Sequence, residues 1–173
     1  MGTIDMIRKK ASGFLPGTIS VNVLKWAVFA VGFIVLLVTL AGGRVSDKPF
    51  EEVKSQVVEA ADTDSMKEAD NRMVKRLYGI DPALYEAVTL YYPVSNMGAE
   101  ELFMVRVKDD SQSDAVMEAI NKRLEAQKRS FDGYGTDQTA ILESSVIKKS
   151  GHDIIFVAAK DAPDVVRVFE SAL

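Results

Sequence analysis

Carboxylate side chains are the best candidates for chemistry in this sequence, because the chain has no cysteine and a single histidine. General acid/base catalysis needs two such groups close together at the reacting bond. Glu100 and Glu101 are adjacent, but neighbouring residues of a strand point to opposite faces, so they make a poor pair. A hydrolase would have to combine carboxylates such as Glu100, Asp132 or Asp137, and we keep this as an alternative hypothesis.

The one histidine, His152, follows a predicted tight turn at Ser150-Gly151. A Ser-His-Asp site would need it beside Asp153 and a serine, but the sequence contains no G-x-S-x-G motif. We therefore expect His152 to be a surface turn residue. With one histidine and no cysteine, a zinc site would need mostly carboxylate ligands, which is an uncommon set.

Two acidic segments match calcium loops only in part. The twelve-residue window Asp132–Glu143 has Tyr134, Thr136 and Asp137 where an EF-hand has two oxygen ligands and a glycine. The segment 62–64 (DTD) lacks both the glycine and the final glutamate of such a loop. The glycines at 133 and 135 follow a predicted helix instead of joining a strand to a helix, so they do not form a phosphate loop. We predict no catalytic residue, no cofactor and no metal ion.

The elements that would position these residues begin near Phe50, after the N-terminal third of the chain. Ser65 and Glu68 form a capping-box pattern at the start of the second predicted helix, and Gly79 ends it. The order predicts an α+β fold, in which two helices precede a ββαββα antiparallel-sheet domain with helices on one face. Apolar spacing predicts helices over 49–61, 66–78, about 111–130, 136–142 and 162–173, and strands over 87–93, 102–108, 145–149 and 153–159.

Both faces of the first predicted hairpin are apolar. One face bears Val88, Leu90, Phe103 and Val105, and the other bears Thr89, Tyr91, Leu102 and Met104. If the second face is open, Tyr91, Leu102 and Met104 form an apolar patch large enough to mark a partner site. The alternative is that the two N-terminal helices cover it, because their own apolar stripes must be buried.

One uncharged apolar stretch, Trp26–Gly43, differs from the rest of the chain. As a helix, its 18 residues would extend roughly 27 Å, close to the thickness of the hydrocarbon core of a bilayer. Ten of them are Leu, Ile, Val or Phe, which together favour insertion by about 3 to 6 kcal/mol. We therefore predict a tail over 1–20, a transmembrane helix over 21–43, a polar linker over 44–49 and a domain over 50–173.

Charge predicts the orientation of this helix. Positive flanks favour the cytoplasm, and the basic residues before the end of the segment are Arg8, Lys9, Lys10 and Lys25. Arg44 and Lys48 weaken this signal from the other side. The chain has a net charge of −4, and because its N-terminal part is basic, the remainder is more acidic still, which argues against a nucleic-acid partner.

A cleaved signal peptide is the main alternative to an anchor. The small residues Ala41, Gly42 and Gly43 could form a cleavage site. The apolar run, however, is longer than the usual apolar region of a signal peptide, about 7–15 residues, and the basic region before it is also long. The sequence therefore favours an uncleaved anchor.

Four motifs carry a family resemblance: RLYGIDPALYEAV (Arg76–Val88), NMGAEELFMVRVKD (Asn96–Asp109), QKRSFDGYGTDQ (Gln127–Gln138) and GHDIIFVAA (Gly151–Ala159). They resemble a domain-of-unknown-function family of envelope proteins and predicted lipoproteins, mostly from Firmicutes, over about Phe50 to Leu173. The resemblance implies a small extracytoplasmic domain held to the membrane, with no assigned activity. Lipoprotein members attach lipid to a cysteine after a small-residue box, whereas here Gly43 follows that box, so no lipid can be attached there.

These observations predict a single-pass membrane protein of the bacterial envelope, with its N-terminus in the cytoplasm and its domain outside. The lipid bilayer is then one partner, through Trp26–Gly43, and an unidentified envelope protein or ligand is another. The missing catalytic constellation favours a non-catalytic interaction or structural module. Two alternatives are an envelope hydrolase that uses carboxylates and a cytoplasmic-facing membrane adaptor with reversed topology.

Overall fold

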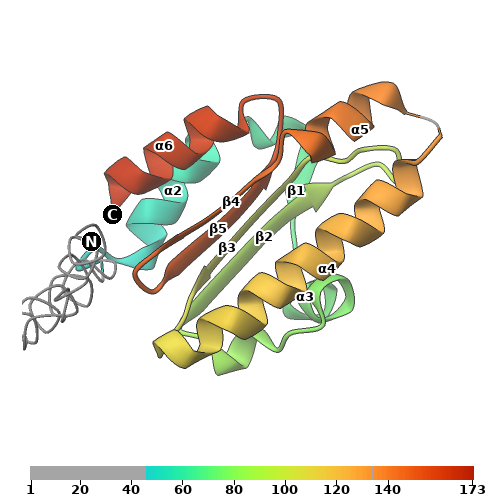
Figure 1. Ribbon diagram of the computed structural model, residues 1–173. Coiled ribbons are helices and arrows are strands. Elements are labelled where there is room, and N and C mark those ends of the chain that lie inside the picture. Colours follow the sequence, from blue (N-terminus) through green and yellow to red (C-terminus); the bar gives the residue numbers. More distant parts are fainter. Residues whose placement is uncertain (1–45, 134) are drawn as a thin grey trace, which may run out of the picture. The chain divides into compact units, whose positions relative to one another are not determined.

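The structure, a computed structural model, describes residues 46–133 and 135–173 (Figure 1). Three short 3-10 turns, Thr63–Ser65, Pro82–Leu84 and Asp110–Gln112, join the longer elements. The helices are α2 (Phe50–Ala60), α3 (Asn71–Tyr78), α4 (Ser113–Phe131), α5 (Thr136–Glu143) and α6 (Ala162–Ala172). The strands are β1 (Met66–Glu68), β2 (Ala87–Pro93), β3 (Glu101–Arg106), β4 (Val146–Ser150) and β5 (Asp153–Ala158).

The strands form one antiparallel sheet in the order β1-β2-β3-β5-β4. Leu90 lies opposite Phe103 in the first hairpin, and Ile147 lies opposite Phe156 in the second. The two hairpins join in the middle of the sheet, where Phe103 pairs with Phe156. The predicted α+β class and the four predicted strands are confirmed, because alternating apolar residues favour strands whatever their partners.

The predicted helix over 66–78 is wrong at its start. Met66–Glu68 is instead the edge strand β1, in which Met66 lies opposite Pro93 of β2. Helix α3 follows Asp70, whose carboxylate accepts a hydrogen bond from the Met73 amide at 2.8 Å. Ser65 is therefore not the helix cap. Pairing with β2 gives the backbone N–H and C=O groups of this segment hydrogen-bond partners. The local capping pattern does not indicate this pairing.

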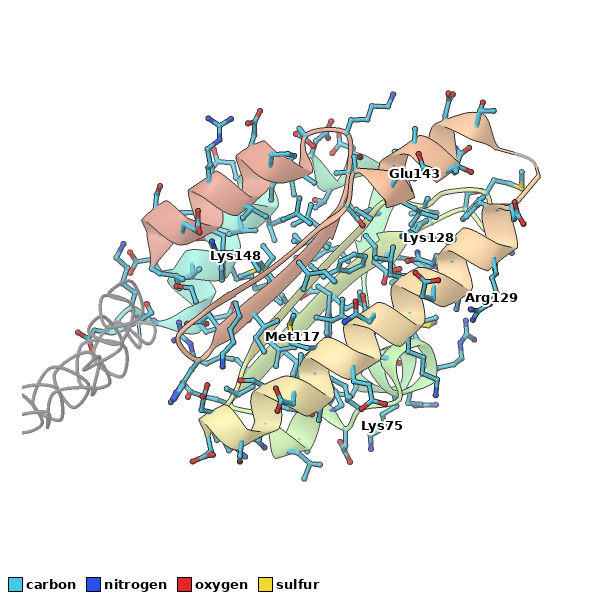
Figure 2. The ribbon with its side chains drawn as sticks, viewed as in Figure 1. Lys75, Met117, Lys128, Arg129, Glu143 and Lys148 are labelled. Atoms are coloured by element: carbon cyan, nitrogen blue, oxygen red, sulfur yellow. The ribbon has the colours of Figure 1, made fainter. Side chains whose placement is uncertain are left out.

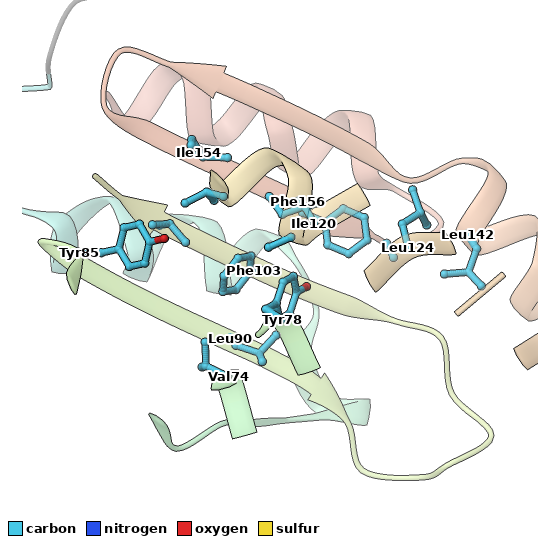
Figure 3. Packing of buried hydrophobic residues seen from close by; sticks show 14 of the residues in the cluster. Val74, Tyr78, Tyr85, Leu90, Phe103, Ile120, Leu124, Leu142, Ile154 and Phe156 are labelled. Atoms are coloured by element: carbon cyan, nitrogen blue, oxygen red, sulfur yellow. The ribbon is translucent and has the colours of Figure 1, made fainter. Parts of the chain in front are cut away.

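Helices cover both faces of the sheet, and not one face as the element order predicted (Figure 1). Residues of α3, α4 and α5 pack on the face that bears Leu90, Phe103 and Phe156. The rings of Tyr78 and Phe103 stack with their centroids 3.9 Å apart. Figure 3 shows this core, with Tyr78 beside Phe103 and Ile120 of α4 near Phe156.

The opposite face is covered by α2 and α6. Val53 and Val57 of α2 and Phe169 of α6 are fully buried in the cluster that also contains Leu102 and Met104. Of the two predicted N-terminal helices, only α2 lies here, since α3 lies on the other face. The C-terminal helix supplies the rest of the cover, with Val165, Val166 and Phe169 in the same cluster.

Within the described ranges, no helix combines the length and the apolar character that crossing a bilayer requires. The predicted tail, the predicted transmembrane helix and the first two linker residues lie in 1–45, outside the described residues. The rest of the predicted linker is tied to the domain. Ser46 is buried, and its hydroxyl donates to the carbonyl of Leu173 at 3.2 Å, so the two ends of the domain lie together.

Candidate functional site

A pocket of about 430 Å³ opens on the α3–α4 side of the sheet. Its walls are α3, α4, the start of α5, β1 and the loop that joins β2 to β3. This volume is within the range of small-molecule sites, about 300 to 1,000 Å³. The lining residues are Lys67, Met73, Arg76, Leu77, Tyr92, Pro93, Val94, Ser95, Asn96, Met97, Gly98, Arg123, Gln127, Ser130, Phe131, Gly135 and Gln138, and we call this site the cationic pocket.

Three basic side chains line the cationic pocket, and none of its lining residues is acidic. Lys67 and Arg76 are exposed, and the Lys67 ammonium lies 5.0 Å from the centre of the Tyr92 ring. Arg123 is more enclosed, with 18% of its side chain accessible. The whole chain has a net charge of −4, so the pocket has the opposite sign to the molecule. Such a concave patch attracts anions.

Two lining residues, Arg123 and Gln127, bond to the side chain of Glu101, which is fully buried at the start of β3. Its carboxylate accepts hydrogen bonds from the Tyr78 hydroxyl at 2.5 Å, from Arg123 Nη2 at 2.6 Å and Nε at 3.1 Å, and from Gln127 Nε2 at 3.1 Å. These bonds compensate a charge that would otherwise be costly to bury. They also hold Arg123 and Gln127 in place, so that both side chains are pre-positioned.

The network around Glu101 shifts the pKa values of Tyr78 and Arg123. Burial, followed by the nearby charge of Glu101, raises the pKa of the Tyr78 hydroxyl well above its usual value. Burial by itself lowers the pKa of Arg123, but the hydrogen bonds and the charge of Glu101 outweigh it and raise that pKa overall. Tyr78 therefore stays a neutral donor and Arg123 stays a cation at physiological pH.

Gln127 has an incomplete set of partners. The residue is only 5% exposed, and its Oε1 atom is buried without a hydrogen-bond partner among the described residues. A carboxylate can only accept, so the amide NH₂ must face Glu101 and Oε1 must face elsewhere.

The loop between β2 and β3 forms an apolar rim on the pocket. Val94 and Met97 are 61% and 69% exposed, so these two side chains present apolar surface beside the cavity. Gly98 allows the loop to close, since a Cβ atom there would lie 2.8 Å from the Cβ of Pro93. The pocket thus combines a cationic lining with apolar contacts.

The second charged cluster lies at the other end of β3. Arg106 and Asp153 form a buried pair, with Nε–Oδ1 at 2.8 Å and Nη2–Oδ2 at 3.0 Å. The remaining nitrogen, Nη1, donates to the carbonyl of Lys48 at 2.8 Å, and the guanidinium lies 5.7 Å from the centre of the Phe50 ring. This bidentate pair fastens the entering chain to the sheet and opens on no pocket described here.

The sheet face that one hypothesis left open for a partner is covered by helices. Leu102 and Met104 are fully buried under α2 and α6, and Tyr91 is partly buried beside the same cluster. The correction follows from the cover that α6 adds from the far end of the chain, which the local pattern of the strands cannot reveal.

The carboxylates of the hydrolase hypothesis do not meet in the cationic pocket. Glu100 is partly buried and its Oε2 accepts from the Ala99 amide at 3.1 Å, while Asp132 and Asp137 are exposed. None of the three lines the pocket. His152 is in the predicted turn before β5 and is partly exposed. Across the described ranges, no three histidine, aspartate or glutamate side chains are grouped as a metal site would require.

Sequence reasoning missed the residues that build the site: Lys67, Tyr78, Arg76, Glu101, Arg123 and Gln127. Arg123 lies on α4 with other basic residues, and one of these, Arg129, is exposed, with its side chain projecting away from the sheet (Figure 2). The available signal was Gln127, a polar residue on the buried stripe of a helix. Such a residue needs a partner, and Arg123 is one turn before it on the same side.

Comparison with known proteins assigns a family. Residues 59–159 match the family described as "Domain of unknown function (DUF4358)". Neither a curated protein nor a solved structure matches the chain. The matched range contains all five strands, α3 to α5 and every residue of the cationic pocket. The chain therefore belongs to the DUF4358 family.

Proposed function

We propose that the protein is a single-pass membrane protein whose extracytoplasmic domain is a non-catalytic binding module, with the cationic pocket as its ligand site. The observation that carries this proposal is the lining of that pocket, with three basic side chains and no carboxylate in an otherwise acidic domain. A preformed cavity of this volume with convergent polar groups is the usual form of a ligand site. Its charge selects anionic ligands.

The point at which the chain enters the domain lies away from the pocket, which supports a pocket that is open to a ligand. The chain enters the domain at Ser46 and Lys48, and Lys48 is bonded to Arg106 at the end of β3. Glu101, which bonds to two residues of the pocket, begins the same strand. Five residue steps along a strand correspond to about 17 Å. The chain therefore enters the domain near Arg106, at the end of β3 opposite Glu101.

Binding is favoured over hydrolysis by the placement of the carboxylates. Glu100, Asp132 and Asp137 do not line the pocket, and the buried Glu101 has its acceptor sites occupied by Tyr78, Arg123 and Gln127. A general acid or base needs access to the substrate within hydrogen-bond distance. Arg123 and Gln127 are instead arranged to hold a ligand.

The orientation is tested with a reporter fused after Leu173 of the full chain in its native host. A reporter that is active only outside the cytoplasm should give a signal, because the basic residues before Trp26 favour retention of the N-terminus inside. Activity of a reporter that works only in the cytoplasm would overturn the proposal and favour the reversed adaptor.

The pocket is tested by photo-crosslinking in the same cells. A photoreactive residue at Met97, on the pocket rim, is compared with one at Leu84, which is 60% exposed and does not line the pocket. We expect an adduct, seen as a mass increase of the protein, at Met97 only. Arg76→Gln should reduce it and Arg72→Gln, on the same helix outside the pocket, should not. Equal labelling at both positions would contradict a ligand site here.

A further inference from the structure

We propose that an extended acidic peptide of a partner protein adds to the sheet as a further strand beside β1, with an acidic side chain directed into the cationic pocket. This inference rests on the binding function proposed above and names the class of ligand. It starts from two independent observations, which are the position of β1 at the edge of the sheet and the basic side chains that line the pocket beside it.

The residues of β1 alternate between bonding to β2 and facing away from it. The Ala69 amide donates to the Leu90 carbonyl at 2.8 Å, so position 69 bonds toward β2. Hydrogen-bonded and non-hydrogen-bonded positions alternate along an antiparallel ladder. Lys67, two residues earlier, therefore also bonds toward β2, whereas Glu68 directs its N–H and C=O away from the sheet.

These outward groups lie at the last strand of the sheet, because no strand of the described residues follows β1 in the order β1-β2-β3-β5-β4. The Val94 amide donates to the Ser65 carbonyl at 3.1 Å, which fixes the same alternation, so Met66 also faces outward. Its N–H is bonded to the carbonyl of Thr63, but its C=O and both backbone groups of Glu68 face the edge. An extended peptide bonds to such groups when it adds to a sheet.

The side chain of Lys67 lies on the pocket face of β1. It lines the pocket, and its ammonium lies over the ring of Tyr92, which is opposite it on β2. A residue of an added strand directly opposite Lys67 has its Cβ atom about 4.5 to 5.5 Å from that of Lys67, with its side chain on the same face. An acidic residue at that position reaches Lys67 at the pocket that Arg76 of α3 also lines.

The charges beside β1 favour an acidic residue on the pocket face only. No ion pair of the described residues includes Lys67 or Arg76. On the opposite face, the Glu68 carboxylate is bonded to the Lys54 ammonium at 2.7 Å, so that face already has a balanced pair. Side chains of a strand alternate between its faces, so the peptide should have neutral residues on either side of its acidic residue.

The probe is a library of random seven-residue peptides displayed on phage and selected against the full chain in detergent. We expect the enriched peptides to carry aspartate or glutamate between neutral residues that favour strands. One enriched peptide is labelled, and fluorescence anisotropy measures its affinity. Replacing its acidic residue by the corresponding amide should weaken binding about tenfold to the unmodified protein and much less to Lys67→Gln, because the two changes remove the same contact.

Two variants of Glu68 test the backbone bonds. Glu68→Pro removes the outward N–H without removing a bond between β1 and β2, and proline is tolerated in this orientation on an edge strand. Glu68→Ala is the matched control, because it also loses the bond to Lys54 but keeps the N–H. The peptide should bind Glu68→Pro about tenfold more weakly than Glu68→Ala. If Glu68→Pro fails to fold, hydrogen exchange of the Glu68 amide in the unmodified protein, which should slow when the peptide binds, tests the same bond.

Other occupants give different results. No enrichment, enrichment without acidic residues, or equal affinity of the two Glu68 variants would overturn the inference. A dimer that forms with rising concentration in the absence of peptide, and that Glu68→Pro disrupts, would identify a second copy of this chain as the added strand instead. If inorganic phosphate reduces the adduct at Met97 while no peptide is selected, the ligand class is wrong and the binding pocket remains. Equal labelling at Met97 and Leu84, by contrast, contradicts the binding function itself.

Discussion

At the scale of single residues, Glu101 is the most informative side chain of this protein. It is fully buried and is paired with three other side chains at once. A buried carboxylate of this kind adds little net stability when it is paired, but its removal leaves the partners without compensation. Its role is therefore to hold Arg123 and Gln127 in place at the pocket.

Glu101→Gln should lower the free energy of unfolding by about 3 kcal/mol, since Arg123 then lacks its carboxylate and Tyr78 loses a charged acceptor. Urea denaturation followed by circular dichroism measures the change. Glu100→Gln is the matched control, because Glu100 is the adjacent residue and is only partly buried, and its effect should stay within about 0.5 kcal/mol. Similar losses for the two variants would contradict the network.

Tyr78 predicts how stability depends on alkaline pH. Its pKa is raised in the folded protein by burial and by Glu101, so the folded state holds the hydroxyl proton more tightly than the unfolded state does. This contribution is fully present below about pH 10, the pKa of an unperturbed tyrosine, and is lost as the pH rises from there toward the folded-state pKa.

Tyr78→Phe should therefore cost about 1.5 to 3 kcal/mol near pH 7, the value of a hydrogen bond to a charged group, and less as the pH rises above 10. Urea midpoints of both proteins from pH 7 to pH 11 measure this. Tyr85 and Tyr91, whose pKa values are also raised, remain in both proteins, so the difference isolates Tyr78. A difference in stability that does not change with pH would argue against the contribution of Tyr78.

At the scale of elements, local patterns and sheet pairing compete in the segment before α3. The sequence offers Ser65 and Glu68 as a capping box, yet the structure pairs Met66–Glu68 with β2 and begins the helix after Asp70. The Glu68 carboxylate then bonds to the ammonium of Lys54 on α2 at 2.7 Å. Glu68 could either take part in a helix cap or pair in a strand. Its contacts with β2 and with Lys54, which are distant in sequence, decide for the strand.

Asp70→Ala should destabilise the domain by about 1 kcal/mol, because the first turn of α3 loses its side-chain cap at Met73. Ser65→Ala is the control, and it should have little effect, since the Ser65 hydroxyl does not cap this helix. Thermal unfolding of the two variants compares them directly. A larger loss of stability for Ser65→Ala than for Asp70→Ala would instead support the capping box that the sequence suggested.

At the scale of the whole molecule, the two ends of the domain lie together, and the pocket lies away from them. Ser46 is bonded to Leu173, and Lys48 is bonded to Arg106, so the entering chain is fastened to the domain within a few residues of Gly43. The pocket is at the other end of β3.

The proposed membrane anchor predicts that Val35→Arg with Leu36→Arg releases the protein from membranes. Each arginine near the centre of a membrane helix costs about 2.5 to 3.5 kcal/mol, so two of them cancel the estimated gain from the ten apolar residues of Trp26–Gly43. Centrifugation of lysed cells separates the two fractions. Gly2→Arg with Thr3→Arg adds the same charge outside the apolar segment and should stay in the membrane fraction.

The unmodified chain provides a further check on this prediction. If the protein with residues 1–43 intact is found in the soluble fraction, the apolar segment does not anchor it. The same result would remove the reason for placing the domain beside a bilayer, but would leave the pocket and its chemistry unaffected.

The sequence by itself determined the α+β class, four of the five strands and most of the helices. Strand patterns such as ELFMVR at 101–106 are short runs of apolar residues between turn signals, and a short chain segment already contains that information. The end of α3 is equally local, because Gly79 adopts φ = 71°, which few other residues tolerate. The same holds for the turn that contains His152.

Only the tertiary structure decided which helices cover each face of the sheet and which basic side chains meet in the pocket. Leu102 and Met104 are buried because α6 reaches them from the far end of the chain, and no local pattern contains that contact. The cationic pocket joins Lys67 of β1, Arg76 of α3 and Arg123 of α4, which are far apart in sequence. The meeting of these side chains depends on how the helices pack on the sheet, which is a property of the complete fold.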